Sequence, residues 1–358
     1  MTLDAPVMIL AGGTGGHIFP GIAVARALQS QGVPVVWLGS RHGLENTLVP
    51  NAHLLLETIA VSGLRGKGGL ALLAAPLRLM RATWQASRVV AKHRPRAALS
   101  FGGFAAGPGG LAARLRGVPI FVHEQNRVPG LTNRVLARIA RRVFAGFPDA
   151  FAAGRSEWTG NPVRSEITAL PPPAQRFAAR GDSLRVLILG GSQGAAALNN
   201  IVPIALSQLR AFKPEIRHQC GTKLLDAARG AYAAAQVDAS VEPFIEDMAA
   251  AYGWADLVIC RSGALTLAEL CAAGVASILV PLPSAADDHQ TANARFLEEH
   301  GAALLMPQAQ LTTGTLAANI RTLAEQPRLR LAMAEAARAL AKPDAAVVVA
   351  RRCLEALA

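Results

Sequence analysis

Short apolar runs that end in a glycine or polar turn recur along the chain, and each predicts a buried strand followed by a helix. In the first half the runs are VMIL (7–10), VPVVWLGS (33–40), AALSFGG (97–103) and VPIFVHEQN (118–126). In the second half they are LRVLIL (184–189), IRHQCG (216–221), ADLVICRSG (255–263) and VASILVPLP (275–283). Nearly continuous apolar strands are typical of a parallel sheet covered by helices on both faces. The pattern therefore predicts an α/β fold with doubly wound sheets.

The two halves of the chain open in the same way. GGTGG (12–16) and GGSQG (190–194) both follow an apolar strand and precede a helical pattern. The openings lie 178 residues apart (190 minus 12), about the length of one doubly wound domain. A chain of 358 residues also suits two domains. We therefore expect two Rossmann-like domains, 1–162 and 163–343, that face a cleft.

Both glycine loops offer backbone N–H groups at the start of a helix, which is an arrangement that binds phosphate. The first loop is not a dinucleotide fingerprint, because Ile18 stands at the third glycine position, and Ile22 replaces the lysine of a Walker A loop. Gly102 and Gly103 form a third segment that could approach a second phosphate. The structural alternative for all three segments is close packing of strand against helix.

A further strand-to-helix turn lies at RSGALTLAE (261–269). Amides at 264–266 and the Thr266 hydroxyl would face a phosphate there, and Glu269 could accept both hydroxyls of a ribose. Thr266 and Glu269 fit a capping box equally well, which is the structural alternative.

The polar segment DDHQTANA (287–294) follows the next predicted strand. That position places it at the carboxyl edge of a doubly wound sheet, where ligands bind. His289, Gln290 and Asn293 could donate or accept hydrogen bonds with sugar hydroxyls. The chain contains no Asp-x-Asp pair, so we expect neither a metal ion nor a cofactor.

Composition narrows the choice of partners. The formal charge is +12, which favours an anionic partner, either a nucleic acid or an acidic membrane surface. Aromatic residues make up only 5% and do not alternate with basic runs, so we do not expect nucleic-acid binding. The four cysteines have no paired spacing, which favours a reducing compartment. We find no targeting signal and no apolar stretch long enough to span a membrane.

Residues 75–90 predict a helix with two apolar stripes. Leu79, Thr83, Ala86 and Val90 form a stripe that we expect to face the core. Leu77, Met80 and Trp84 form a second stripe on roughly the opposite side, with Arg81 and Arg88 beside it. An apolar stripe flanked by arginines fits contact with a membrane surface, and GLRGKGG (63–69) adds positive charge. The alternative is a helix that is buried on two sides.

Several of these stretches occur together in one order: GGTGGHIFPG (12–21), SGLRGKG (62–68), HEQN (123–126), GNPVR (160–164), GGSQGA (190–195), RSGALTLAE and DDHQTANA. The combination resembles the MurG family, the bacterial UDP-N-acetylglucosamine transferases that convert lipid I to lipid II. The resemblance implies the GT-B architecture and an inverting transfer of N-acetylglucosamine to the muramyl C4 hydroxyl of undecaprenyl-linked muramyl-pentapeptide. It also implies that the helix at about 344–358 returns to the first domain.

Localisation and partners follow from the same resemblance. It implies a peripheral protein on the cytoplasmic face of the bacterial inner membrane, with UDP-GlcNAc and lipid I as substrates. An anionic membrane surface and other cell-wall synthesis proteins are further expected partners. A UDP-GlcNAc 2-epimerase of similar architecture is an alternative enzyme class, and a basic RNA-binding protein is a non-enzymatic one.

The resemblance also implies site residues. For the donor these are Thr14, Gly15, Gly16, Asn126, Arg164, Ser192, Ile245, Ala264, Leu265, Thr266, Leu267, Ala268, Glu269 and Gln290, to which we add His289. For the acceptor we expect Gly13, His17, Gly102 and Gly103.

The reaction needs a base on the acceptor hydroxyl, and a neutral imidazole suits that task near neutral pH. We expect His17 to be that base. The alternatives are that it only binds the acceptor or caps the helix. Glu124 is a weaker candidate, because a carboxylate beside His123 and Gln125 can also be structural.

Overall fold

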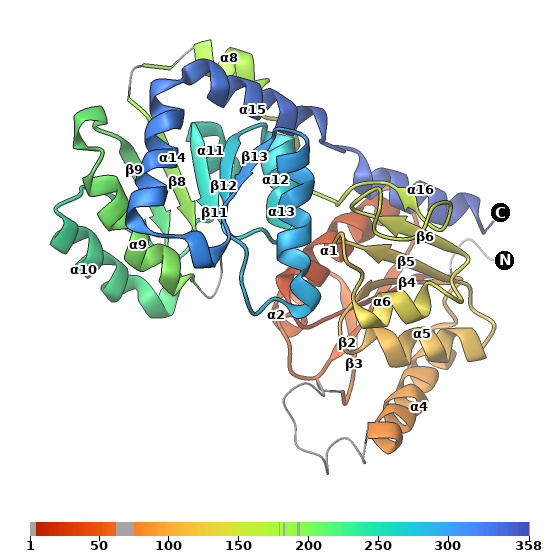
Figure 1. Cartoon of the computed structure of the whole chain (residues 1–358). Helices are drawn as coiled ribbons and strands as arrows, with labels where there is room; N and C mark the ends of the chain where they lie inside the picture. The colour runs from red at the N-terminus through yellow and green to blue at the C-terminus, as the bar shows by residue number, and fades with distance from the viewer. Residues whose placement is uncertain (1–4, 62–74, 179, 182, 192–193, 358) are drawn as a thin grey trace. The chain divides into compact units, whose positions relative to one another are not determined.

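The computed structural model describes residues 5–61, 75–178, 180–181, 183–191 and 194–357. Ser192 and the segment GLRGKGG lie outside these residues. The chain divides into two compact units, Met1–Val163 with Asp344–Ala358 and Arg164–Pro343 (Figure 1). Among the described residues, no helix combines the length and the apolar character needed to cross a bilayer.

The first unit holds a seven-stranded sheet in the order β3-β2-β1-β4-β5-β6-β7, with every neighbouring pair parallel. Its strands are β1 (Val7–Ala11), β2 (Val35–Ser40), β3 (Leu55–Ile59), β4 (Ala97–Gly102), β5 (Ile120–Glu124), β6 (Arg142–Ala145) and β7 (Glu157–Trp158). Its helices are α1 (Gly15–Gln29), α2 (Glu45–Asn51), α4 (Ala75–His93), α5 (Ala106–Leu115), α6 (Leu131–Leu136) and α16 (Ala345–Glu355).

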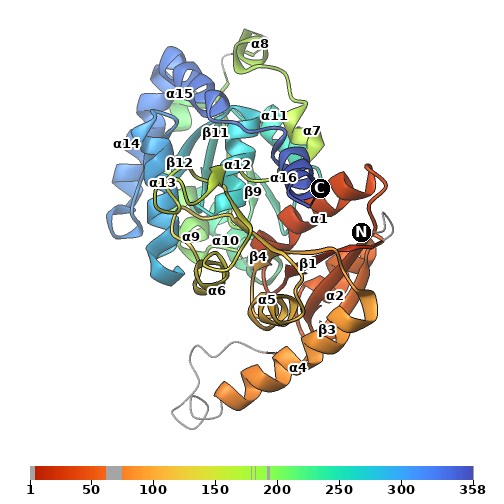
Figure 2. The same cartoon turned by 90° about the vertical axis from the view of Figure 1, so that its right-hand side faces the viewer.

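The alternation of side chains along β1 explains why helices cover both faces of this sheet. Val7 and Ile9 belong to a core shared with α1 and α16, whereas Met8 and Leu10 belong to a second core shared with α4 and α5. Figure 2 shows α4 beside α5 and, separately, α1 beside α16. Successive residues of a strand point to opposite faces, so an all-apolar strand must be covered twice.

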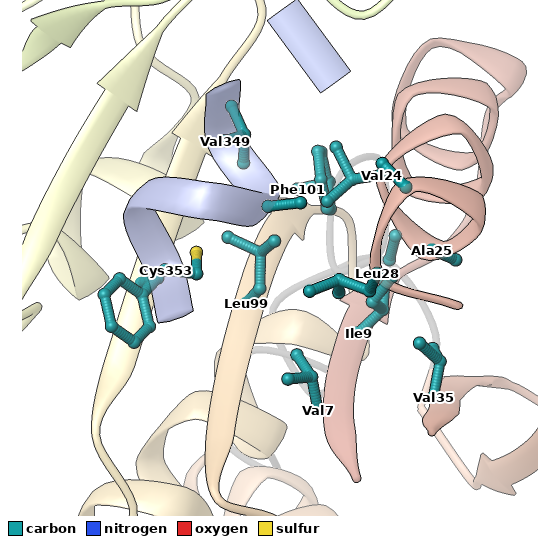
Figure 3. Packing of buried hydrophobic residues seen from close by; sticks show 14 of the residues in the cluster. Val7, Ile9, Val24, Ala25, Leu28, Val35, Leu99, Phe101, Val349 and Cys353 are labelled. Atoms are coloured by element: carbon teal, nitrogen blue, oxygen red, sulfur yellow. The ribbon is translucent and has the colours of Figure 1, made fainter. Parts of the chain in front are cut away.

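The C-terminal helix α16 completes the first core. Val349 and Cys353 are fully buried and lie against Leu99 of β4 and Leu28 of α1 (Figure 3). Burying an apolar side chain of this size contributes about 1.5–3 kcal/mol. The last residues of the chain are therefore structural residues of the first unit.

Helix α4 differs from the predicted pattern at one position. Ala82, Ala86 and Val90 face the core, as an i, i+4 spacing requires. Leu79, expected in that stripe, is 49% exposed, so the expectation is wrong at this residue. The core contact of α4 begins one turn later than the sequence pattern indicates.

The second unit holds a six-stranded parallel sheet in the order β10-β9-β8-β11-β12-β13. Its strands are β8 (Arg185–Leu189), β9 (Glu215–Gln219), β10 (Ser240–Glu242), β11 (Leu257–Cys260), β12 (Ala276–Leu279) and β13 (Ala303–Leu305). Its α-helices are α7 (Ser165–Thr168), α8 (Pro173–Ala178), α9 (Ala196–Ser207), α10 (Leu225–Ala235), α11 (Met248–Trp254), α12 (Ala264–Ala273), α13 (His289–Glu299), α14 (Thr313–Glu325) and α15 (Pro327–Ala339). Short 3₁₀ turns occupy Arg210–Phe212, Thr222–Leu224, Ala286–Asp288 and Gln308–Gln310.

Both sheets reverse their strand order at one point, and these points position the functional loops. In the first unit the chain runs outward from β1 to β2 and β3, then returns to β4 on the other side of β1. In the second unit β8 and β11 are the corresponding pair. The crevice at the carboxyl end of such a pair is where doubly wound sheets bind ligands.

Candidate active site

The first glycine loop connects β1 to α1 and fixes the orientation of His17. Thr14 is the N-cap residue of α1, and His17 lies in the first turn of that helix. The Nδ1 atom of His17 lies 3.2 Å from the carbonyl oxygen of Gly12 and 3.4 Å from Thr14 Oγ1. A carbonyl oxygen only accepts hydrogen bonds, so the contact with Gly12 favours the neutral tautomer that carries the proton on Nδ1 and the lone pair on Nε2.

Gly102 and Gly103 end β4, the other strand of the switch point, and they lie against the first loop. Both adopt left-handed backbone conformations, with φ of +100° and +91°. A Cβ atom on Gly103 would overlap the carbonyl oxygen of Gly12, and one on Gly102 would lie 3.3 Å from His17 Nε2. Glycine is therefore required for this close approach. The structure brings four of the predicted residues together, namely Gly13, His17, Gly102 and Gly103.

Glu124, the weaker candidate base, is buried at the end of β5 and holds a loop. Its carboxylate accepts hydrogen bonds from the amides of Asn126 (3.0 Å) and Gly130 (3.2 Å) and from the Asn133 side chain (3.0 Å). Burial raises the pKa of Glu124, although these hydrogen bonds oppose the shift. Because both oxygens already have donors, the geometry favours a positioning role for Glu124.

Asn133 is a residue that the sequence did not single out. Its side-chain NH₂ donates to Glu124, and its side-chain oxygen accepts from the Ser100 hydroxyl. That hydroxyl in turn accepts from the Gly102 amide. The chain of contacts connects the turn after β5 to the glycine turn after β4. Asn133 carries no local signal, since it lies inside an ordinary helical pattern.

The second glycine loop connects β8 to α9, and a buried amide holds it. The Gln219 side chain accepts from the Gly191 amide (3.0 Å) and donates to the Gly191 carbonyl (2.9 Å). Gly194 has a φ of +76°, and a Cβ atom there would overlap the carbonyl oxygen of Cys220. The loop is thus fixed at both of its described ends, while Ser192 lies outside the described residues.

Helix α12 begins at Ala264 with Gly263 as its N-cap residue. Thr266 therefore lies inside the first turn, and the capping-box interpretation of Thr266 and Glu269 is wrong, because it requires Thr266 at the N-cap position. The first-turn amides, which include those of Ala264, Leu265 and Thr266, have no partner within the helix. Ala264 and Leu267 pack inward, whereas Leu265, Thr266 and Ala268 are partly exposed.

Glu269 connects two side chains of the second unit. Its carboxylate accepts from the Arg164 guanidinium (2.9 Å) and from the Tyr252 hydroxyl (3.1 Å). Arg164 is half-exposed, while Tyr252 is fully buried, and burial with the adjacent Glu269 charge raises the pKa of its phenol. Two predicted residues, Arg164 and Glu269, are therefore in direct contact, and Tyr252 is the partner that the sequence did not indicate.

The predicted donor residues Ile245, His289 and Gln290 also lie in the second unit. Ile245 is 3% exposed, and Asn293 of α13 is fully buried, with its side-chain amide donating to the Ser262 carbonyl. The Gln290 side chain accepts from the Leu282 amide (2.9 Å), and the Gln290 carbonyl accepts from the Ser262 hydroxyl (2.8 Å). His289 is the first residue of α13 and is partly buried. The donor roles of these residues, and those of Thr14, Gly15, Gly16 and Asn126 in the first unit, stay predictions.

Family models match both units of the chain. The glycosyltransferase family 28 N-terminal domain matches residues 7–145, and the glycosyltransferase family 28 C-terminal domain matches residues 185–349. Two parallel sheets with these two domains constitute the GT-B fold. The predicted fold class is therefore confirmed.

Individual proteins of high similarity indicate which members of the family the chain resembles. The UDP-N-acetylglucosamine–N-acetylmuramyl-(pentapeptide) pyrophosphoryl-undecaprenol N-acetylglucosamine transferase of Xanthomonas campestris pv. campestris (strain 8004) is 61% identical over 345 residues, which cover 96% of this chain and 80% of the relative. The crystal structure of Acinetobacter baumannii MurG is similar with a TM-score of 0.87 and 42% identity, covering 98% of this chain and 100% of that chain.

The alternative enzyme class shares the fold alone. UDP-GlcNAc 2-epimerase from Neisseria meningitidis has a TM-score of 0.68 and 12% identity, covering 98% of this chain and 99% of that chain. The fold is common to the transferases and the epimerases, so it does not distinguish them. Sequence identity does: it is 61% to the transferase and 12% to the epimerase, each over nearly the whole chain. The protein belongs to glycosyltransferase family 28, among the UDP-N-acetylglucosamine–N-acetylmuramyl-(pentapeptide) pyrophosphoryl-undecaprenol N-acetylglucosamine transferases.

Proposed function

We infer that the protein transfers N-acetylglucosamine from UDP-GlcNAc to lipid I and so forms lipid II for peptidoglycan synthesis. The observation that carries this conclusion is 61% identity, over 96% of the chain, to a transferase of that activity. The glycine loops at both switch points agree with it, because a nucleotide sugar and a pyrophosphate-linked acceptor each bring phosphates to be held by main-chain amides.

We propose that the transfer is a single displacement at the anomeric carbon. The C4 hydroxyl oxygen of the muramyl residue forms the new bond, and the bond between the anomeric carbon and the β-phosphate oxygen breaks. The hydroxyl proton passes to Nε2 of His17, and the electron pair of the broken bond leaves with UDP. His17 suits the role because the contact of its Nδ1 with the Gly12 carbonyl favours the neutral tautomer in which Nε2 is the basic nitrogen.

We assign the donor to residues of the second unit. The amides at the start of α12 would bind a negatively charged group, since they lie at the positive end of the helix dipole. They would stabilise the diphosphate as it gains charge on departure. Glu269 would accept the ribose hydroxyls, and binding would then require its carboxylate to exchange part of its contact with Arg164.

We assign the acceptor's pyrophosphate to the turn formed by Gly13, Gly102 and Gly103. These glycines present backbone without side chains next to His17. The Gly13 amide donates to Glu45 and the Gly102 amide to Ser100, so of these three residues Gly103 would offer its amide to the phosphates, and the acceptor hydroxyl would then lie within reach of the base.

We propose that α4 rests on an anionic membrane surface and thereby brings the first unit to its lipid-linked acceptor. Leu77, Met80 and Trp84 are 67%, 60% and 60% exposed, and the Arg88 guanidinium lies 5.0 Å from the centre of the Trp84 ring. Arg81 is also exposed, and each such charge near an anionic surface contributes about 1 kcal/mol. Anionic vesicles should retain the wild type and release a Trp84→Glu variant, whereas equal retention would remove this role.

The function is tested with purified protein, UDP-GlcNAc and a short-chain lipid I analogue. We expect a β1→4 disaccharide product and one UDP released for each acceptor consumed. Omission of the acceptor should abolish sugar turnover. Conversion of UDP-GlcNAc without acceptor would instead identify an epimerase and overturn the conclusion.

A further inference from the structure

Glu45 is a buried carboxylate that the proposed mechanism leaves unused. It is the first residue of α2, directly after the turn that follows β2, and it is fully buried. Carboxylates are rarely buried without several donors, because removing their charge from water is costly. Glu45 has three: Oε1 accepts from the Ser40 amide (2.8 Å) and the Ser40 hydroxyl (2.6 Å), and Oε2 accepts from the Gly13 amide (3.0 Å).

Three glycines make room for this carboxylate. A Cβ atom on Gly12, Gly39 or Gly43 would overlap the Glu45 side chain. Burial opposes ionisation of Glu45, but the hydrogen bonds from Ser40 and Gly13 outweigh it and lower the pKa of the carboxyl below its ordinary value. The group is therefore a negative charge at neutral pH, held in place from several sides.

The position of that charge ties it to His17 through one peptide unit. The N–H of Gly13 and the C=O of Gly12 belong to the same planar peptide. Glu45 Oε2 accepts from its N–H end, and His17 Nδ1 lies 3.2 Å from the oxygen at its C=O end, where the Nδ1–H tautomer would donate. A negative charge at the N–H end polarises the peptide and strengthens its oxygen as an acceptor, as in any chain of hydrogen bonds.

We propose that Glu45 is a positioning residue that fixes the orientation and the Nδ1–H tautomer of His17 through the Gly12–Gly13 peptide. The inference rests on the proposed role of His17 as the base. Glu45 is fully buried, so it would act on the reaction through the Gly12–Gly13 peptide, by holding the His17 ring in the orientation that the base needs. A carboxylate that orients a histidine across a peptide performs the task that a directly bonded carboxylate performs in a hydrolase triad.

The geometry requires a carboxylate rather than an amide. Three N–H or O–H donors converge on the two oxygens of Glu45. A glutamine side chain has one acceptor oxygen, so its NH₂ group would face the amide of either Gly13 or Ser40. Glu45→Gln thus keeps the shape of the side chain but sets a donor against a donor.

The first test reads the His17 ring directly. In protein labelled with ¹⁵N-histidine, the ring nitrogen shifts distinguish the two tautomers, and a His17→Gln variant assigns the His17 signals. We expect the Nδ1–H form in the wild type and in Glu57→Gln, a control that removes a carboxylate of β3 bonded to Lys92 and His93. Glu45→Gln should show a mixture of tautomers.

The second test is kinetic. Glu45→Gln should lower kcat by about 10- to 100-fold, the range found when a group that orients a metal-binding histidine is lost, while KM for UDP-GlcNAc stays close to wild type. Glu57→Gln should leave both parameters unchanged. A Glu45→Gln protein that keeps its kcat and the Nδ1–H tautomer would overturn the proposal.

The outcomes separate this proposal from the one on which it rests. If His17→Ala keeps its turnover, the base assignment fails, and the tautomer measurement still decides whether Glu45 orients the ring. If Glu45→Gln does not fold, the wild-type spectrum decides: an Nε2–H ring at neutral pH would refute the proposed link, and an Nδ1–H ring would support it.

Discussion

The loop after β1 and the loop after β8 occupy corresponding places in their sheets, and a side chain from the neighbouring strand or its following turn holds each. In the first unit that side chain is Glu45, which follows β2; in the second it is Gln219, the last residue of β9. Glu45 only accepts hydrogen bonds, whereas Gln219 both donates and accepts.

The difference between the two side chains determines what each loop can offer. The Gln219 side chain forms hydrogen bonds with both the N–H and the C=O of Gly191, so the main-chain polar groups of Gly191 are satisfied within the protein. Glu45 accepts a hydrogen bond only from the N–H of the Gly12–Gly13 peptide, and the C=O of the same peptide lies against His17. The first loop is thereby coupled to a titratable side chain, whereas Gly191 of the second loop is bonded to an amide that does not titrate.

The largest expected effect is a kinetic division between the two units. His17→Ala should lower kcat by about 10²- to 10⁴-fold with donor affinity unchanged, because the loss falls on proton transfer. Glu269→Ala should weaken donor binding by about 10- to 100-fold, equivalent to about 1.5–3 kcal/mol for hydrogen bonds to a charged group. Steady-state transfer with UDP-GlcNAc as the varied substrate measures both parameters. Wild-type turnover in His17→Ala would end the assignment of that residue as base.

Glycine substitutions test the packing that both loops share. Gly103→Ala and Gly194→Ala place a methyl group onto the backbone oxygens of Gly12 and Cys220, respectively. Each should cost about 1–3 kcal/mol of overpacking beyond the strain of a left-handed alanine, which is about 1–2 kcal/mol. Gly32→Ala, with φ of +74° and no atom within 4 Å of the new methyl, supplies the strain alone. Thermal unfolding midpoints that are equal for all three variants would contradict the close contacts.

The smallest effect sharpens the contrast between carboxylate and amide. The pKa of Glu45 is lowered in the folded protein, so its ionised form stabilises the fold above pH 4.5 and this stabilisation is lost as the pH falls through the lowered value. The destabilisation caused by Glu45→Gln, about 1–3 kcal/mol at neutral pH, should therefore shrink in acid. Gln219→Leu should cost a similar amount at every pH, because an amide does not titrate. Unfolding midpoints at neutral pH and below pH 4.5 make the comparison, and a constant cost for Glu45→Gln would contradict the ionised state.

Much of this architecture was readable from the sequence because it depends on local patterns. Apolar runs that end in glycine gave the strands, and two matching openings indicated two doubly wound units. His17 could be singled out because it directly follows a glycine segment, and Glu269 because it lies one turn after Thr266 in the segment RSGALTLAE.

The groups that hold the loops could not be found in this way. Glu45 and Gln219 lie 32 and 28 residues from the glycines they bind, and only the pairing of neighbouring strands brings them there. Asn133 lies 33 residues from Ser100, and Tyr252 lies 17 residues from Glu269. Both residues lie in helices whose sequence pattern gives no sign of these contacts. The prediction for Leu79 was wrong for a related reason. Periodicity indicates which face of a helix is apolar, but not at which turn the helix begins to contact the core.

A double-mutant cycle on kcat for disaccharide formation addresses the coupling of Glu45 to His17 most directly. Glu45→Gln should reduce kcat by about 10- to 100-fold in the wild-type background. In the His17→Ala background the same substitution should change kcat very little, because residues that act as one unit are not additive. An equal fold-reduction in both backgrounds would show that Glu45 acts independently of His17 and would contradict the connection through the Gly12–Gly13 peptide.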